Sequence, residues 1–207
     1  RYLMEQRVGH SDIETKSLNS LVSHVDKRAE MRLVKGLKAV LPEAGFLAEE
    51  GTEGADEGVR FRWVVDPLDG TTNLIHGLPV FCVSVALVHG DTPLVAVVYD
   101  ASRDECFTAV KGGGTHLNGE RVRCSDCSSL QHALVATGVP HWDFTRMSEY
   151  LQAMTAFAKG TRGLRRMGSA AIDLAYVACG RFDVFFEYSL QPWTSQLDCC
   201  WCKNLGG

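Results

Sequence analysis

Apolar residues recur at helical spacing in three parts of the chain. The first predicted helix covers residues 27–41 and ends before Pro42. Its apolar face consists of Ala29, Leu33, Val34, Leu37, Val40 and Leu41. A second helix is predicted from Met147 to Phe157, with Gly160 as its stop signal, and a third is predicted over residues 170–178.

Short apolar runs predict strands between these helices. Phe61–Val65 is one such run, and Val80–Val88 and Leu94–Tyr99 form a predicted hairpin around His89-Gly90-Asp91. Further strands are predicted at residues 105–110, 133–137 and 182–187. An early helix, an antiparallel middle and a later alternation of helix and strand predict an α+β or α/β protein built from layered sheets and helices.

Composition narrows the functional classes. The 207 residues carry a net charge of -4, which gives no electrostatic footprint for nucleic acid or for an anionic membrane. No apolar run reaches the roughly 18 residues of a membrane-spanning helix, and no signal-peptide segment follows Arg1–Met4. The eight cysteines are interpreted as free thiols of a cytoplasmic protein. Cys124-x-x-Cys127 lacks the second ligand pair that a zinc site needs.

The candidate chemistry is concentrated in residues 66–73, Asp-Pro-Leu-Asp-Gly-Thr-Thr-Asn. Asp66 and Asp69 leave the end of a predicted strand three positions apart, and carboxylate and carbonyl oxygens are the ligands that Mg²⁺ prefers. Gly70 lets backbone N–H groups approach a ligand closely, and a Gly-Thr-Thr turn presents such groups to an anion such as phosphate. An acid-rich turn without a ligand is the alternative interpretation of this motif alone.

Four further segments, two upstream and two downstream, place the motif in a recognisable order. Glu49-Glu50 follows an apolar stretch upstream, and Lys16–Asp26 precedes it. Gly168–Ala175 and Phe182–Glu187 follow downstream. In this order the chain resembles the inositol monophosphatase family over most of residues 16–193. The resemblance implies a layered α-β-α-β-α sandwich of the inositol monophosphatase and sugar phosphatase type. We expect a metal- and phosphate-binding part at residues 1–128 and a substrate-side part at residues 129–207, within one globular unit.

The resemblance also implies a role for each site residue. Glu49, Asp66, the Leu68 backbone carbonyl and Asp69 hold two or three Mg²⁺ ions. Thr71, paired with Asp26, orients and deprotonates the attacking water, assisted by Glu49. The amides of Gly70 and Thr71 bind the phosphate, and Asp69 is a further substrate-binding residue. Ser169, Ala170 and Glu187 contact the alcohol portion of the substrate.

Simpler roles stay open for several of these side chains. Asp26 is also in a position to cap the helix that follows it, and Glu187 is also placed as a surface acid at a strand end. Lys16 is either a surface charge or a group near the metals. His76 is interpreted as a loop residue, because the predicted site already has its oxygen ligands.

The chain departs from the family pattern after Trp193. The family has an aspartate ligand for the second metal where Thr194 stands, and the cysteine-rich segment that follows matches no family motif. One nucleotide inserted after the Trp193 codon would turn codons 198–202 into an apolar Leu-Leu-Leu-Val strand. We therefore hypothesise a frameshifted and truncated C-terminus, with weak or absent activity in the chain as it stands.

The expected reaction is Mg²⁺-dependent hydrolysis of a phosphorylated polyol, myo-inositol 1-phosphate first. Histidinol phosphate, fructose 1,6-bisphosphate and a nucleotide 3'-phosphate are alternative substrates. Outside the enzyme class, the alternative is a catalytically impaired scaffold with a binding or regulatory role. Thr194 favours this alternative, and the intact acids Glu49, Asp66 and Asp69 argue against it. The resemblance further implies a lithium-sensitive homodimer.

Overall fold

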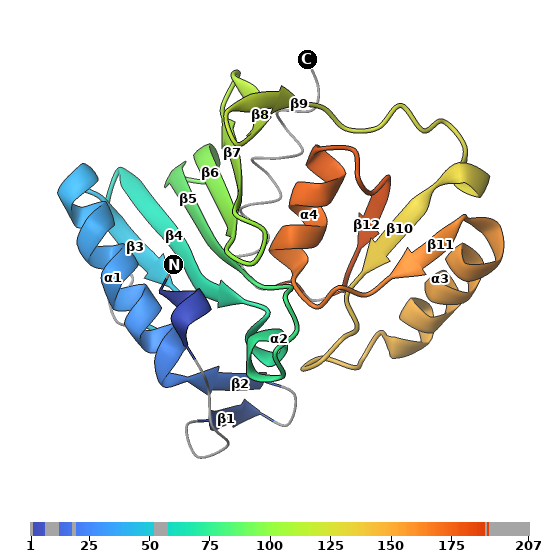
Figure 1. The fold of residues 1–207 in the computed structure, drawn as a ribbon, viewed down its shortest axis with the longest axis horizontal. Coiled ribbons are helices and arrows are strands. Elements are labelled where there is room, and N and C mark those ends of the chain that lie inside the picture. The colour runs from blue at the N-terminus through green and yellow to red at the C-terminus, as the bar shows by residue number, and fades with distance from the viewer. Residues whose placement is uncertain (1, 7–12, 18–19, 52–57, 189, 191–207) are drawn as a thin grey trace.

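The computed structural model describes residues 2–6, 13–17, 20–51, 58–188 and 190. Five layers follow one another across the molecule, as Figure 1 shows: helix α1 (His24–Val40), a large sheet, helix α4 (Ala170–Ala178), a small sheet and helix α3 (Met147–Gly160). This arrangement confirms the predicted sandwich of alternating helices and sheets.

The large sheet has seven strands in chain order. They are β3 (Gly45–Ala48), β4 (Phe61–Asp69), β5 (Cys82–His89), β6 (Thr92–Asp100), β7 (Glu105–Val110), β8 (Gly114–Leu117) and β9 (Glu120–Val122). β3 and β4 are parallel, and every later pair is antiparallel. The sheet therefore begins with one crossover and continues as a meander.

The small sheet is entirely parallel. Its order is β11 (Gly163–Arg165), β10 (Leu134–Thr137) and β12 (Val184–Phe186). A separate antiparallel hairpin of β1 (Ile13–Ser17) and β2 (Ser20–Ser23) leads into α1. The other short elements among the described residues are α2 (Thr71–Ile75) and the 3₁₀ turns Leu3–Glu5 and Leu130–His132.

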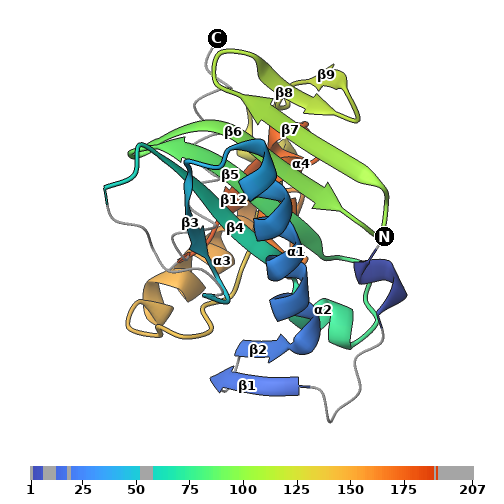
Figure 2. The ribbon, with the colours of Figure 1, turned by 90° about the vertical axis from the view of Figure 1, so that its left-hand side faces the viewer.

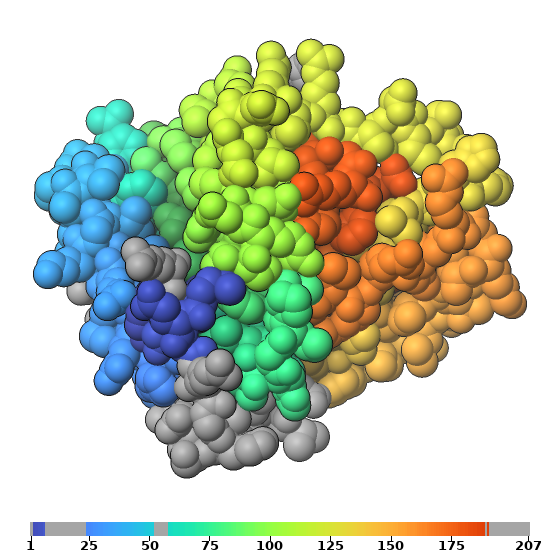
Figure 3. Space-filling model, in the orientation of Figure 1, coloured from blue at the N-terminus to red at the C-terminus, as the bar shows by residue number. Residues whose placement is uncertain are grey.

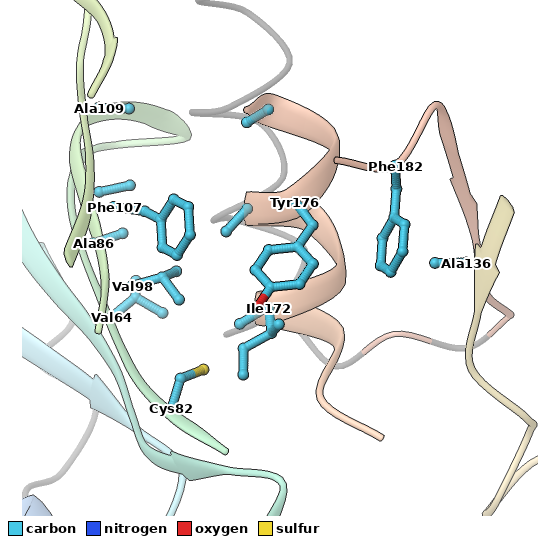
Figure 4. Packing of buried hydrophobic residues seen from close by; sticks show 14 of the residues in the cluster. Val64, Cys82, Ala86, Val98, Phe107, Ala109, Ala136, Ile172, Tyr176 and Phe182 are labelled. Carbon is cyan, nitrogen blue, oxygen red and sulfur yellow. The ribbon is translucent and has the colours of Figure 1, made fainter. Parts of the chain in front are cut away.

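Helix α4 is buried between the two sheets. Ile172 and Tyr176 extend toward Val64, Val98 and Phe107 of the large sheet in Figure 4, while Phe182 and Ala136 lie on the side of the small sheet. Burial on both sides requires a helix that is apolar around most of its circumference, and Ala170–Ala178 has that composition.

Helix α1 covers the opposite face of the large sheet (Figure 2). Val34 packs with Phe46, Trp63 and Val65 in a second apolar cluster. One predicted member of the apolar face is wrong: Val40 is 72% exposed, because it points to solvent from the last turn of the helix.

Most predicted elements are confirmed, and their ends shift by a few residues. The β5–β6 hairpin, β7 and α4 lie where the pattern predicts them. The predicted strand 61–65 is too short, because β4 continues through the motif to Asp69. The pattern does not predict β1, β2, β8, β9 or β11, all of five residues or fewer. The division into parts 1–128 and 129–207 stays a prediction. Among the described residues, no helix is both long and apolar enough to cross a membrane.

Candidate active site

The site is built around the C-terminal end of β4. Asp66 is buried, and its Oδ1 accepts a hydrogen bond of 3.1 Å from the Leu68 amide. The pairing of β4 with β5 shifts between Asp66 and Asp69, which marks a bulge at this point. A bulge re-aims side chains and tolerates Pro67, which has no N–H to give to a regular ladder. The motif is thus a distorted strand end rather than a free loop.

Negative charges surround Asp66. Burial raises the pKa of Asp66 well above its ordinary value, and the nearby Glu49 and Asp69 carboxylates raise that pKa further. Glu49 is held at the end of β3, where its amide donates to the Val65 carbonyl at 3.1 Å. Burial also raises the pKa of Asp69, while hydrogen bonds from Ser169 and Ala171 and the charge of Arg166 oppose that rise.

This donor set fits a hard divalent cation. The Glu49 and Asp69 carboxylates both act on Asp66, and a cation near these acids would offset that repulsion. Oxygen ligands of this kind select Mg²⁺ or Ca²⁺ rather than soft metals. Within the described part of the chain, no three His, Cys, Asp or Glu side chains already converge as a closed metal cluster. A shared ion therefore requires these acids to turn toward it.

Thr71 and Asp26 are brought together from distant parts of the sequence. Thr71 Oγ1 lies 2.8 Å from Asp26 Oδ1 and 3.0 Å from the Leu68 carbonyl oxygen, so its single proton has two acceptors. Asp26 lies in the first turn of α1 and is only 2% exposed. The structure thus pairs these two side chains directly, in addition to placing Asp26 at the start of the helix.

Gly70 makes the turn between β4 and α2 possible. Its φ of +95° lies in a region that L side chains rarely adopt, and an added Cβ would lie 2.8 Å from the Val80 carbonyl oxygen. Asn73, buried in α2, donates to the Val80 and Met167 carbonyls at 2.7 and 2.9 Å. In the space-filling view of Figure 3, α2 adjoins the segment that leads into α4.

Asp69 connects β4 to the start of α4. Its Oδ2 accepts hydrogen bonds of 2.7 Å from both the Ser169 hydroxyl and the Ala171 amide. Ser169 also caps α4, since its Oγ accepts from the Ile172 amide at 3.3 Å. Ser169 is 1% exposed, and Ala170 beside it is half-buried. The predicted contacts of Ser169 and Ala170 with a substrate alcohol stay predictions.

Glu187 follows β12 and lies against Gly138, at the end of β10. A Cβ on Gly138 would meet the Glu187 carboxylate, so a side chain at position 138 would require Glu187 to move. Glu187 and Asp69 both act on Asp173, whose pKa rises to about 8, chiefly through burial and then through these two charges. Arg166 opposes that rise. The half-buried Glu187 therefore belongs to an electrostatic group that reaches Asp69.

Sequence reasoning missed two members of this group. Asp173 is 1% exposed and its Oδ1 has no hydrogen-bond partner, and the exposed Arg166 acts on both Asp69 and Asp173. A charged residue in the otherwise apolar α4 was the available signal. His76 ends α2 as an exposed residue, consistent with its interpretation as a loop residue. Lys16 lies in β1, and Thr194 lies outside the described residues.

The comparisons with known proteins agree with this fold. The chain matches the inositol monophosphatase family over residues 2–200. It is 40% identical over 206 residues to Nus factor SuhB of Pseudomonas aeruginosa, covering 98% of this chain and 76% of that protein. It is also 40% identical over 200 residues to the inositol-1-monophosphatase of Rhizobium meliloti, covering 97% and 75%.

A solved structure extends the likeness to three dimensions. The extragenic suppressor protein suhB from Bartonella henselae superposes with a TM-score of 0.88 at 39% identity, over 94% of this chain and 74% of that one. The fold and site define an α/β protein with mixed sheets and a buried acid group at a strand end. The chain belongs to the inositol monophosphatase family, and its homologues include a protein named inositol-1-monophosphatase.

Proposed function

We propose that the chain hydrolyses a phosphate monoester with the help of Mg²⁺. The observation that carries the proposal is the buried Asp66, on which the half-buried Glu49 and Asp69 act, beside the hydrogen-bonded pair of Thr71 and Asp26. These three acids and the Leu68 carbonyl would hold two or three ions. Magnesium, when bound, neutralises charge on the phosphate oxygens and favours deprotonation of water at neutral pH.

The protein residues position the nucleophile and the phosphate. The Thr71 hydroxyl has Asp26 as a proton acceptor at 2.8 Å, so its oxygen can orient a water and accept a proton from it. Glu49 assists as a second base. The amides of Gly70 and Thr71, at the turn into α2, would donate to the phosphate oxygens, and Asp69 would meet the phosphate only through a shared Mg²⁺ ion. No covalent enzyme intermediate is required in this scheme.

We place the alcohol side of the substrate near Glu187, Ser169 and Ala170. A carboxylate is a good acceptor for the hydroxyls of a polyol, and myo-inositol 1-phosphate offers several. The relative named inositol-1-monophosphatase, at 40% identity, supports this substrate over histidinol phosphate, fructose 1,6-bisphosphate and nucleotide 3'-phosphates. A homodimer is part of the same proposal.

A phosphate-release panel tests the substrate. The purified chain would be assayed with myo-inositol 1-phosphate, histidinol phosphate, fructose 1,6-bisphosphate and a nucleoside 3'-phosphate, each with Mg²⁺ and with EDTA. We expect release from myo-inositol 1-phosphate to have the highest kcat/KM and to require Mg²⁺. A higher kcat/KM for any of the other three would overturn the substrate assignment while leaving the reaction class intact.

The second candidate is a scaffold with little or no catalysis. Two observations favour it: Thr194 stands where the family has an aspartate, and the chain is as similar to a protein named Nus factor SuhB as to the named phosphatase. A Thr194→Asp variant separates the two. If the lost ligand limits the reaction, the variant gains Mg²⁺-dependent phosphate release over the unchanged chain. Equal, full activity of both would remove the reason for this candidate.

A further inference from the structure

Two acids on α1 share one buried face of the helix. Asp26 and Glu30 are four residues apart, which places them one above the other, and they are 2% and 0% exposed. Like charges at this spacing destabilise a helix, and burial of a carboxylate without compensation is costly. Their retention therefore calls for a specific partner for each.

The partners lie in two turns of the site, one after β4 and one after β3. Asp26 accepts from the Thr71 hydroxyl, as described above. Glu30 Oε2 accepts a hydrogen bond of 2.7 Å from the backbone amide of Glu50. A charged acceptor on a backbone N–H makes a short, strong hydrogen bond. One helix thus holds both the turn after β4 and the turn after β3.

The held amide is next to a proposed metal ligand. Glu49 precedes Glu50 directly, and its own amide is fixed by the Val65 carbonyl. The peptide segment that carries the Glu49 side chain is therefore fastened on both sides, by β4 at one amide and by α1 at the next. Groups that orient a metal ligand in this way affect metal affinity without touching the ion.

We propose that Glu30 is a positioning residue, which holds the Glu49-Glu50 turn so that Glu49 is aimed at the magnesium site. The inference rests on the proposed function, since it assumes that Glu49 is a ligand. This role requires a side chain at position 30 that is long enough to accept the hydrogen bond from the Glu50 amide. It does not require that side chain to be negatively charged.

Three substitutions separate position from charge. Glu30→Gln keeps the length and an acceptor oxygen but removes the charge. Glu30→Asp keeps the charge but is one methylene too short to reach the amide, and Glu30→Met removes the acceptor. Glu43→Met is the matched control, because Glu43 is an exposed acid in the turn just after α1.

Magnesium binding would be measured by titration calorimetry on the chain and its four variants. Thermal unfolding in EDTA would report on the fold of each. We expect Glu30→Met and Glu30→Asp to bind Mg²⁺ about 10-fold or more weakly. Glu30→Gln and Glu43→Met should stay within about threefold of the unchanged chain. Full-strength binding by Glu30→Met, or binding retained by Glu30→Asp and lost by Glu30→Gln, would overturn the inference.

The unchanged chain separates this inference from its premise. If it binds no Mg²⁺, the proposed function fails and the inference falls with it. If it binds Mg²⁺ and the Glu30 variants bind equally well, only the inference fails. If Glu30→Met is unfolded in EDTA at the assay temperature, the test rests on Glu30→Asp and Glu30→Gln. These two variants have opposite expected results, weakened and retained Mg²⁺ binding.

Discussion

Each of four site residues interacts with a group that sets its orientation or its charge. These residues are Asp26, Thr71, Asp66 and Asp69. Thr71 lies between Asp26 and the Leu68 carbonyl, so its hydroxyl is directed by two acceptors. Asp69 receives two donors from the start of α4. Burial and the nearby Glu49 and Asp69 carboxylates raise the pKa of Asp66, and a divalent cation would offset this repulsion.

Removal of the Thr71 hydroxyl should slow the chemical step. A Thr71→Val variant has the same shape but neither donates to Asp26 nor accepts a proton from water. We expect kcat for phosphate release to fall roughly 10²- to 10⁴-fold, the range of general acid–base contributions. Thr71→Ser, which restores the hydroxyl, should recover most of the activity. Activity retained by the Val variant would remove Thr71 from the mechanism.

Asp173 should make stability depend on pH. Its pKa is about 8 in the folded protein and about 3.9 in the unfolded chain, so between these values only the folded state holds the proton. Stability contributed by that proton is therefore lost as the pH rises through the window, by about 1.4 kcal/mol per pH unit. Asp69, Glu187 and Arg166 are the charges that act on it.

The Asp173→Asn variant cannot ionise and should lack this slope. Its free energy of unfolding, measured in urea with EDTA present, should exceed that of the unchanged chain by an amount that grows from about pH 5 to about pH 8. A difference between the two proteins that stays constant over this range would show that Asp173 does not carry a raised pKa.

At the scale of elements, the turn from β4 into α2 sets the geometry of the motif. The distorted end of β4 presents Asp66 and Asp69, and Gly70 reverses the chain at a positive φ. Helix α4 contributes the other side of the site, since its Ala171 amide donates to Asp69. The geometry of the site therefore depends on the turn from β4 into α2 and on the start of α4.

An alanine at position 70 should damage the fold and the site together. The added Cβ meets the Val80 carbonyl at 2.8 Å and forces a strained φ, which costs about 1–3 kcal/mol. Gly36→Ala is the control, because it lies in α1 with nothing within 4 Å and should stabilise the protein by about 0.5–1 kcal/mol. Urea unfolding compares the two; a Gly70→Ala protein as stable as the original contradicts the described turn.

The sequence predicts elements better than contacts between them. Asp66 and Asp69 are predictable because the motif, its strand and its glycine are contiguous. Glu30 is not, since its role comes from a hydrogen bond to a residue 20 positions away, and Asp69 reaches Ala171 across 102 positions. The short strands β8, β9 and β11 escape prediction because three or four residues carry too little periodicity.

At the scale of the whole molecule, α4 joins the layers. It packs on the large sheet through Ile172 and on the small sheet near Phe182, and its N-terminus meets Asp69. Loss of packing at this helix should therefore weaken both sheets and the site at once.

An Ile172→Ala variant tests this coupling. Ile172 is fully buried, so its truncation should lower the free energy of unfolding by about 2–5 kcal/mol. Leu151→Ala, on the 51% exposed position of α3, should change it by no more than about 0.5 kcal/mol. Calorimetric melting should show one transition in both. Two separated transitions in the Ile172→Ala protein would contradict the cooperative unit.

The proposed phosphate-ester hydrolysis requires Glu49, Asp66 and Asp69 to bind magnesium. Its most direct test is a Mg²⁺ titration of phosphate release from myo-inositol 1-phosphate. The titration is made on the unchanged chain and on the Thr194→Asp variant, each with and without Asp66→Asn. We predict a saturable rise with Mg²⁺ that Asp66→Asn abolishes while the protein stays folded in EDTA. Phosphate release that is unchanged by Mg²⁺, or that continues at full rate in Asp66→Asn, would contradict magnesium-dependent hydrolysis at these acids.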